Sequence, residues 1–413
     1  MLPPLLIESV AYLGSGVARH DGCVHFIPGT CPGELVEAKV TKIRKTFREA
    51  ELVSVLKPSA DRLAAPDCLV DAGGSSIPVP GCVYGHVTHN AELGYKLEQL
   101  ASFLKRQAKL ENVEKLPIGK FASSKPLNYR NRIKLHYGTG KGGEQLLGYI
   151  GEDNFSVVDM AQCPLAVPEI NEKLASLRED EEFWKWVSSR GVVSLRWTGT
   201  DGVVVSSGSS EFFGTEKLSL TEKIPVFGSL KVPLNGFFQV NPEVGAALVS
   251  HITDTVTRCA PDELIDFYCG VGVYGLSVSK MGVPKVSGFD SGRDVIRAAN
   301  SNAGMKKVRA SFYCKHVGKI ARRVLKNISG RKSMAIVNPP RSGLDRGTLD
   351  ALIASPVENL LYVSCAPDTL SRDLAVLCGA GGSYHVISAD IFDMFPRTAY
   401  FETVIHMVKT RTK

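Results

Sequence analysis

The sequence predicts an α/β protein of three parts: a small β-barrel, a mixed central region and a doubly wound sheet. Residues 1–58 alternate apolar and polar side chains in short runs broken by glycine and proline, a pattern typical of a small barrel. From about residue 233 strand-like runs alternate with helical ones, which indicates a mostly parallel sheet covered by helices. The length of 413 residues also exceeds the size at which one hydrophobic core keeps growing.

Charge and hydropathy restrict the environment of the chain. The net charge is +7, from 49 Lys and Arg against 42 Asp and Glu, a mild excess that permits a polyanionic partner without requiring one. No apolar run approaches the roughly 20 residues of a membrane span. The first residues lack the basic stretch and cleavage site of a signal peptide. We therefore expect a monomeric, cytoplasmic protein without a membrane partner.

The barrel region, residues 1–58, carries a basic stretch that fits two interpretations. Its cationic residues alternate with apolar ones and would lie along one strand ribbon, where they could follow a phosphate backbone. Charged runs are also common on solvated strand faces, so both interpretations stay open here. The cationic residues are Lys39, Lys42, Arg44, Lys45 and Arg48.

The central region, residues 59–232, mixes both kinds of element. Leucines at positions 93, 97, 100, 104 and 110 fall on roughly one face and predict a helix over residues 93–110. Residues 129–136 and 146–150 read as strands. The arginines of Tyr129-Arg130-Asn131-Arg132 either contact a nucleic acid or are exposed charges of an edge strand.

A glycine loop opens the third region, residues 233–413. The apolar strand 263–268 leads into Gly270, Gly272 and Gly275, which match G-x-G-x-x-G, and Asp290 ends the following strand. Glycines allow close approach of a ligand, and an acid at the second strand tip accepts hydrogen bonds from ribose hydroxyls. This pattern alone fits a nicotinamide dinucleotide as well as S-adenosylmethionine.

Three later motifs provide the parts needed to activate a pyrimidine ring carbon. Asn338 begins an Asn-Pro-Pro-Arg turn after the apolar run 334–337 and offers a planar amide. Cys365 follows the strand-like run 360–363, and Glu402 ends the motif 393–402. A thiolate that adds to uracil carbon 6 makes carbon 5 nucleophilic, and a carboxylate can then remove the carbon 5 hydrogen.

These motifs, from the first residues to Glu402, resemble the RNA uracil-C5 methyltransferases that make 5-methyluridine, and the first region resembles their RNA-binding TRAM domain. The resemblance implies a Rossmann-like, S-adenosylmethionine-dependent methyltransferase domain behind an OB-like barrel. It implies that Cys365 is the nucleophile and Glu402 the general base. The implied cofactor contacts, which include two of the loop glycines, are Gln239, Tyr268, Gly270, Gly272, Asp290 and Asn338.

The TRAM-like start favours an RNA substrate of the 23S ribosomal branch over transfer RNA, with no DNA partner expected. Three alternatives are a transfer-RNA uridine-C5 methyltransferase, a non-catalytic RNA-binding protein on a degenerate methyltransferase core, and a NAD-dependent oxidoreductase. Intact Cys365 and Glu402 argue against the second, and the sequence offers no recognisable hydride-acceptor site for the third.

Many members of this family hold a [4Fe-4S] cluster on four cysteines. This chain offers Cys68, Cys82 and Cys163, but Val79 stands where another ligand is expected. A cluster on three thiolates needs a further ligand or an open iron. The alternative is that these cysteines are reduced thiols without metal.

Overall fold

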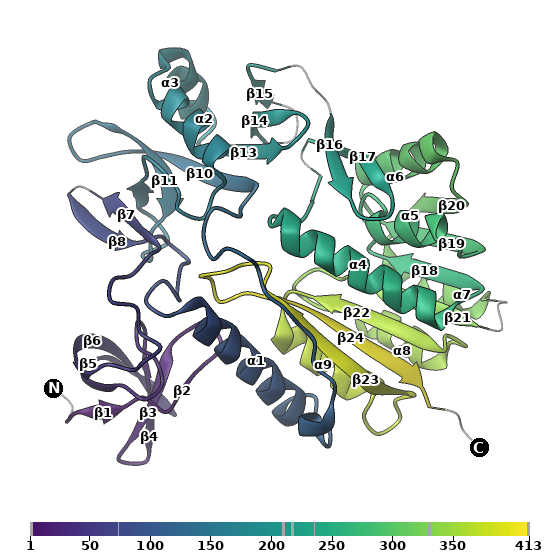
Figure 1. Cartoon of the computed structure of the whole chain (residues 1–413), viewed down its shortest axis with the longest axis horizontal. Coiled ribbons are helices and arrows are strands. Elements are labelled where there is room, and N and C mark those ends of the chain that lie inside the picture. The colour runs from purple at the N-terminus through teal and green to yellow at the C-terminus, as the bar shows by residue number, and fades with distance from the viewer. Residues whose placement is uncertain are drawn as a thin grey trace.

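The computed structural model describes residues 3–72, 74–208, 211–215, 219–234, 236–328 and 332–410. Figure 1 shows a small barrel near the N-terminus, a mixed layer above it and a large sheet with helices on both faces. This arrangement confirms the predicted fold class. Within the described residues, no helix has the length and apolar character needed to cross a membrane.

The N-terminal barrel is one six-stranded sheet in the order β1-β5-β6-β4-β3-β2. Residues 5–10 close it, because β1 pairs with β5 at one edge and β2 pairs with β3 at the other. Small and branched side chains such as Ile7, Ala18, Ile27 and Val36 fill its interior. The strands are β1 (Leu5–Leu6), β2 (Ser9–Val10), β3 (Gly16–His20), β4 (Cys23–Ile27), β5 (Leu35–Ile43) and β6 (Phe47–Lys57).

The middle of the chain forms an antiparallel sheet in the order β12-β11-β10-β13-β14-β15, with two helices packed on it. Two short hairpins, β7 with β8 and β16 with β17, stand beside it. The elements are β7 (Leu69–Ala72), β8 (Ser75–Pro78), β10 (Arg132–Thr139), β11 (Gln145–Ile150), β12 (Val157–Asp159), α2 (Pro168–Arg178), α3 (Glu181–Ser188), β13 (Val192–Thr198), β14 (Gly202–Ser207), β15 (Glu211–Phe213), β16 (Ser219–Ile224) and β17 (Gly228–Pro233).

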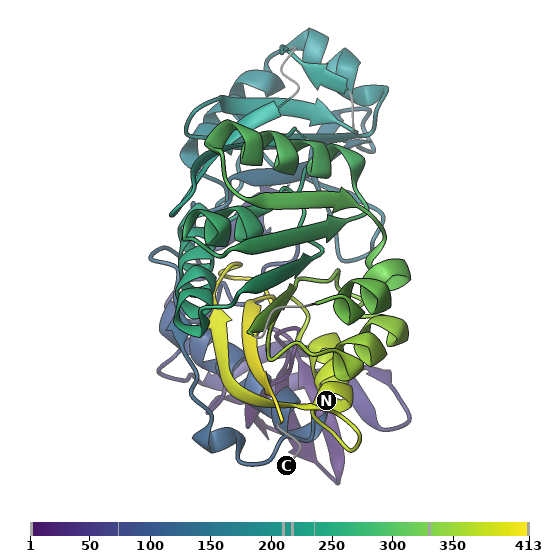
Figure 2. The ribbon, with the colours of Figure 1, turned by 90° about the vertical axis from the view of Figure 1, so that its right-hand side faces the viewer.

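The large sheet has the order β20-β19-β18-β21-β22-β24-β23-β9. Its first five strands are parallel and β24 is antiparallel to both neighbours, as the side view shows (Figure 2). The elements are α4 (Pro242–Cys259), β18 (Glu263–Phe267), α5 (Val273–Lys280), β19 (Lys285–Asp290), α6 (Arg293–Lys306), β20 (Ala310–Cys314), α7 (Val317–Lys326), β21 (Ser333–Val337), α8 (Arg346–Ala354), β22 (Asn359–Ser364), α9 (Pro367–Leu377), β23 (Tyr384–Phe392) and β24 (Glu402–Lys409).

Both faces of this sheet are buried, which explains its continuous apolar strands. Helices α4 and α5 pack on the face that carries Leu264, Met334 and Leu361. The other face, which carries Phe267 and Tyr362, packs against α7, α8 and α9.

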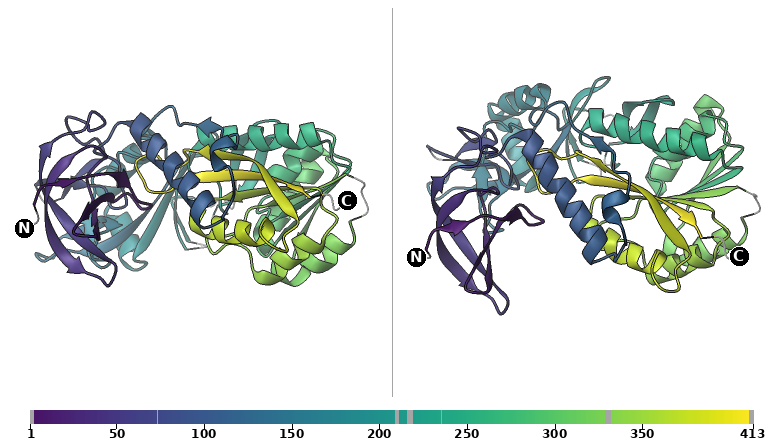
Figure 3. Two further views of the ribbon diagram at one scale, coloured as in Figure 1. Left: turned by 90° about the horizontal axis from the view of Figure 1, so that it is seen from below. Right: turned by 60° about the horizontal axis from the view of Figure 1, so that its bottom comes forward.

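Two earlier segments also belong to this large core. Helix α1 (His89–Arg106) buries Leu93, Leu100 and Leu104 beside α9, and Figure 3 shows it between the barrel and the last strands. The short helix η1 (Val113–Lys115) follows it, and β9 (Lys120–Phe121) adds the last strand of the sheet beside β23. Helix α1 begins four residues before the predicted start, because Thr88 caps it by accepting a hydrogen bond from the Ala91 N–H.

Candidate active site

The strand register brings Cys365 and Glu402 together. Ser364, the last residue of β22, pairs with Thr403 of the antiparallel β24, and Thr403 Oγ1 donates to the Ser364 carbonyl at 2.9 Å. Cys365 follows Ser364 and Glu402 precedes Thr403, so the two residues face each other at the end of this strand pair. A thiol and a carboxylate that stand 37 positions apart thus share one site.

Burial changes the acidity of both groups. The Glu402 side chain is only 5% exposed, and this burial raises its pKa to about 8, with a smaller opposing effect of Arg341. Burial, followed by the negative charge of Glu402, raises the pKa of Cys365, while the Arg341 guanidinium lowers it. A carboxyl with this pKa can both accept and release a proton near neutral pH.

Arg341 is a site residue that the sequence reasoning missed. Its guanidinium lies 4.2 Å from the ring centroid of Tyr400 and close enough to Cys365 to lower the pKa of that thiol. A cation in this position favours the thiolate, which is the nucleophilic form of cysteine. The signal was present in the sequence, because Arg341 directly follows the Asn-Pro-Pro turn.

The glycine loop connects β18 with α5 and depends on left-handed backbone. Gly270 has φ of 53° and Gly272 has φ of 79°, a region in which residues with a Cβ are strained. A Cβ on Gly272 would also lie 2.7 Å from the Phe312 ring. The Gly270 N–H donates to Asp290 Oδ2 at 3.1 Å, so Asp290 holds the loop from the neighbouring strand.

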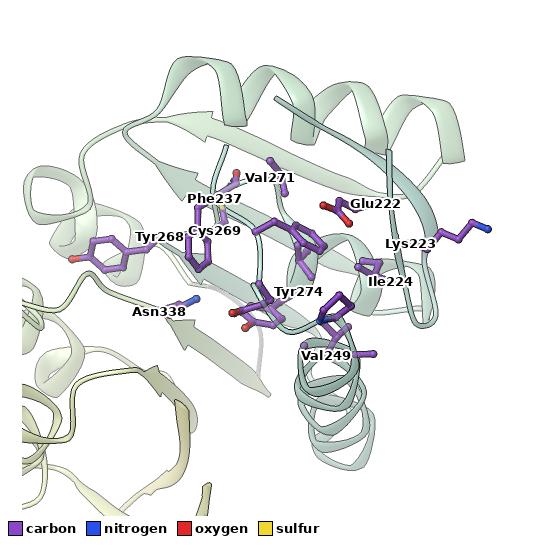
Figure 4. Close-up of a pocket in the computed structure, with 17 residues that line it drawn as sticks. Glu222, Lys223, Ile224, Phe237, Val249, Tyr268, Cys269, Val271, Tyr274 and Asn338 are labelled. Carbon is purple, nitrogen blue, oxygen red and sulfur yellow. Dashed lines mark hydrogen bonds between the residues drawn. The ribbon is translucent and has the colours of Figure 1, made fainter. Parts of the chain in front are cut away.

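A pocket opens beside this loop, over the ends of β18 and β21 (Figure 4). Four of the six residues expected to contact a cofactor line it: Gln239, Tyr268, Gly270 and Asn338. Gly272 and Asp290 do not line this pocket, and their contact with a cofactor stays a prediction. Gln239 Oε1 is buried and has no hydrogen-bond partner within the described residues, so an acceptor is available to a ligand.

The sequence reasoning also missed the contribution of the β16–β17 hairpin and of Tyr274. Glu222 and Ile224 of β16 form one side of the pocket, where Glu222 pairs with Arg196 at 2.7 Å. Tyr274 lines the pocket beside Gln239 and lies close enough to Glu402 for that charge to raise its pKa, after the larger effect of burial. Tyr274 therefore connects the pocket with Glu402.

The Tyr129-Arg130-Asn131-Arg132 segment leads into an inner strand, which contradicts the edge-strand interpretation, while contact of its arginines with a nucleic acid stays a prediction. Strand β10 lies between β11 and β13, so it is not an edge strand. The Asn131 amide donates to the Gln239 carbonyl at 3.2 Å, and the Tyr129 hydroxyl donates to the Pro396 carbonyl at 2.9 Å. The segment thus holds the chain on two sides of the active site.

The three cysteines of the expected cluster lie in the core of the central region. A hydrogen bond with Cys82 and burial raise the pKa of Cys68, and Cys163 lies near enough to add to this effect. The Tyr149 hydroxyl lies 3.5 Å from Cys163 Sγ. In the part of the chain that the structure describes, no group of three His, Cys, Asp or Glu side chains could hold a metal ion. The iron–sulfur hypothesis is therefore not supported.

Two family models match the chain. One, described as tRNA (Uracil-5-)-methyltransferase, matches residues 213–410, and the other, a TRAM domain, matches residues 4–53. An uncharacterized RNA methyltransferase of Thermosynechococcus vestitus is 28% identical over 448 residues, covering 97% of this chain and 96% of that protein. One of Protochlamydia amoebophila is 28% identical over 446 residues, covering 98% and 96%.

A solved structure shares the complete fold. The Pyrococcus abyssi tRNA (uracil-54, C5)-methyltransferase, in complex with S-adenosyl-L-homocysteine, gives a TM-score of 0.74 at 22% identity. The match covers 98% of this chain and 100% of that one.

Proposed function

Because the chain is a TRAM-containing member of the tRNA (uracil-5-)-methyltransferase family, and therefore an S-adenosylmethionine-dependent RNA methyltransferase, we propose that it methylates carbon 5 of a specific uridine in 23S ribosomal RNA. The observation that carries this proposal is the register that sets Cys365 opposite Glu402. A protein that only binds RNA would not require a thiol and a carboxylate placed opposite each other, as Cys365 and Glu402 are. A nicotinamide enzyme does not belong to this family.

The pocket beside the glycine loop fits S-adenosylmethionine. Gln239, Tyr268, Gly270 and Asn338 would hold the cofactor, with the unpartnered Gln239 oxygen as an acceptor and Asp290 keeping the loop in place. When bound there, S-adenosylmethionine supplies a methyl group on a sulfonium.

The residues of the chain carry out the remaining steps. The Cys365 thiolate, stabilised by Arg341, forms a bond to carbon 6 of uracil, and the electrons of the 5,6 double bond make carbon 5 nucleophilic. Once carbon 5 carries the methyl group, the Glu402 carboxylate accepts its proton. The 5,6 double bond then re-forms as the bond between carbon 6 and Cys365 Sγ breaks.

The choice of 23S ribosomal RNA rests on the TRAM domain at residues 4–53. Transfer RNA is the second candidate, favoured by the description of the matching family and by the named substrate of the Pyrococcus abyssi enzyme. The half-buried Cys365 thiol can reach the ring only if the uridine leaves its stack, so both candidates imply an unpaired or easily opened site. The cytoplasmic location and the monomeric state remain predictions.

Methylation of fractionated RNA tests the proposal. The protein is incubated with methyl-labelled S-adenosylmethionine and with 23S, 16S and transfer RNA from cells that lack it, and nucleosides are then separated. We expect labelled 5-methyluridine in 23S RNA and none with Cys365→Ala. Label in transfer RNA alone would move the substrate to the second candidate. Absence of 5-methyluridine from every fraction would contradict the activity.

A further inference from the structure

A second groove lies on the far side of helix α1 from the sheet, between this helix and strands β2, β3 and β4 of the barrel. Figure 3 shows α1 alongside the barrel. Aromatic and charged side chains line the groove. They include Tyr12, Arg19, Phe26, Glu98, Phe103 and Arg106.

The aromatic residues of the groove offer faces for stacking. Tyr12 meets Phe103 edge-on, with ring centroids 5.3 Å apart and an interplanar angle of 85°. Phe26 packs similarly against Phe47 of β6, at 5.2 Å. Tyr12, Phe26 and Phe103 are all only half-buried, so part of each ring is accessible from the groove.

Cations stand at its rim. Arg106, in the last turn of α1, is exposed and has no ion pair or hydrogen bond within the described residues. Arg19 of β3 is 59% exposed and pairs with Glu8, which is itself 40% exposed. Glu98 is an opposing charge on the same groove. An unpaired arginine beside partly exposed aromatic rings suits a ligand with flat bases and a phosphate backbone.

Tyr12 connects this groove with the active site. It lies in the turn between β2 and β3 and packs against the core of the large sheet, and its hydroxyl is near enough to Asp368 and Arg341 for their charges to act on its pKa, after the larger effect of burial. The turn is fixed to α1 because the Gln99 amide donates to the Ala11 carbonyl at 3.2 Å. An RNA chain that leaves Cys365 beside Tyr12 would therefore enter the groove.

We propose that this groove binds an unpaired nucleotide of the RNA chain that flanks the target uridine. The base stacks on Phe26 and the Tyr12–Phe103 pair, while Arg106 and Arg19 contact its phosphates. This inference rests on the proposed function, since it requires an RNA substrate at Cys365. It assigns to the barrel a part in placing the substrate, through residues other than the basic stretch of residues 39–48.

Binding of a fluorescein-labelled uridine decamer to the full-length protein tests the groove. Arg106→Gln removes the free cation, and Ser102→Trp fills the groove, which Ser102 lines. Lys105→Gln is the matched control, because it removes the same charge from the neighbouring exposed position outside the groove. Fluorescence anisotropy at several salt concentrations gives Kd, and melting temperatures check that each variant folds.

We expect Kd to rise about tenfold for Ser102→Trp and about fivefold for Arg106→Gln, with a salt slope about one unit shallower for the latter. Lys105→Gln should stay within about twofold. Equal Kd values for Arg106→Gln and Lys105→Gln, together with unchanged binding by folded Ser102→Trp, would overturn the proposal. An RNA duplex that competes as well as the unlabelled decamer would also overturn it, because stacking needs unpaired bases.

The outcomes separate this inference from the proposed function. If the wild-type protein methylates RNA but the groove variants bind the decamer normally, the groove proposal fails and the proposed function stands. If the Kd values follow the expected pattern but no RNA is methylated, the groove stands as an RNA-binding site and the proposed activity fails.

Discussion

Lys96 Nζ donates to Asp393 Oδ1 at 2.9 Å, although the two residues are 297 positions apart and both side chains are fully buried. Lys96 also pairs with Glu92 at 2.7 Å, and Glu92 accepts from the Arg397 N–H at the same distance. Asp393 begins the loop that leads to Glu402, and Phe392 pairs with Glu402 at its base. Helix α1 therefore fixes the segment that carries the proposed base.

Replacement of Lys96 should destabilise the protein. Lys96→Met leaves Glu92 and Asp393 buried with one cation fewer, and loss of one partner from a buried ion pair costs about 3–5 kcal/mol. Urea unfolding measures the loss, and Lys105→Met, at an exposed position of the same helix, should change little. An equal free energy of unfolding for both variants would show that the buried pairs contribute nothing to stability.

Cys365→Ala should abolish methylation and leave binding of S-adenosylmethionine unchanged, because the thiol acts only on the base. Isothermal titration measures the binding, and transfer of labelled methyl groups to RNA measures the activity. Turnover within about tenfold of the wild type would rule out Cys365 as the nucleophile, since loss of a nucleophile costs far more.

The Glu402→Gln variant should still attack and methylate the base, but it should fail to break the bond between carbon 6 and Cys365. Gln keeps the shape of the side chain and loses its basicity, so the protein should remain joined to RNA through Cys365. Denaturing electrophoresis with methyl-labelled cofactor should show a labelled, slowly migrating band that is absent from Cys365→Ala/Glu402→Gln. Release of 5-methyluridine at the wild-type rate would mean that another base removes the proton.

The buried Glu402 carboxyl should also make stability depend on pH. Its pKa is about 8 in the folded protein against an ordinary 4.5, so its proton favours folding below pH 4.5, and this contribution is lost as pH rises through 8. Glu402→Gln should therefore gain in melting temperature relative to the wild type between pH 5 and pH 9. Glu172→Gln, on the exposed side of α2, should show no such trend. A gain independent of pH would contradict the raised pKa.

Arg341→Met should raise the pKa of Cys365, because the guanidinium favours the thiolate. The rate of alkylation by iodoacetamide at the Cys365 peptide, followed by mass spectrometry, should shift to higher pH. Arg346→Met removes a charge that is 73% exposed and should leave the profile unchanged. Identical alkylation profiles for both variants would show that Arg341 does not change the pKa of the Cys365 thiol.

The sequence contained the local features of this structure and none of its long-range partners. Apolar runs predict β18, β21 and β22, and the residues after them predict the glycine loop and Cys365, because these signals repeat over a few neighbouring positions. The pairing of Lys96 with Asp393 and the addition of β9 to the sheet follow from tertiary packing alone. The same reason explains why the position of β10 inside its sheet could not be predicted from the sequence, which left an edge strand as one of two interpretations.

Helix α1 carries Lys96, which contacts the loop before Glu402, and ten positions later Arg106, which lines the groove beside the barrel. Each residue of an α-helix turns about 100° around the axis. One inserted residue between these positions would therefore rotate one contact away while leaving the other in place. The spacing along this helix, with Gln99 bonded to the barrel between the two positions, therefore keeps the groove in register with the loop before Glu402.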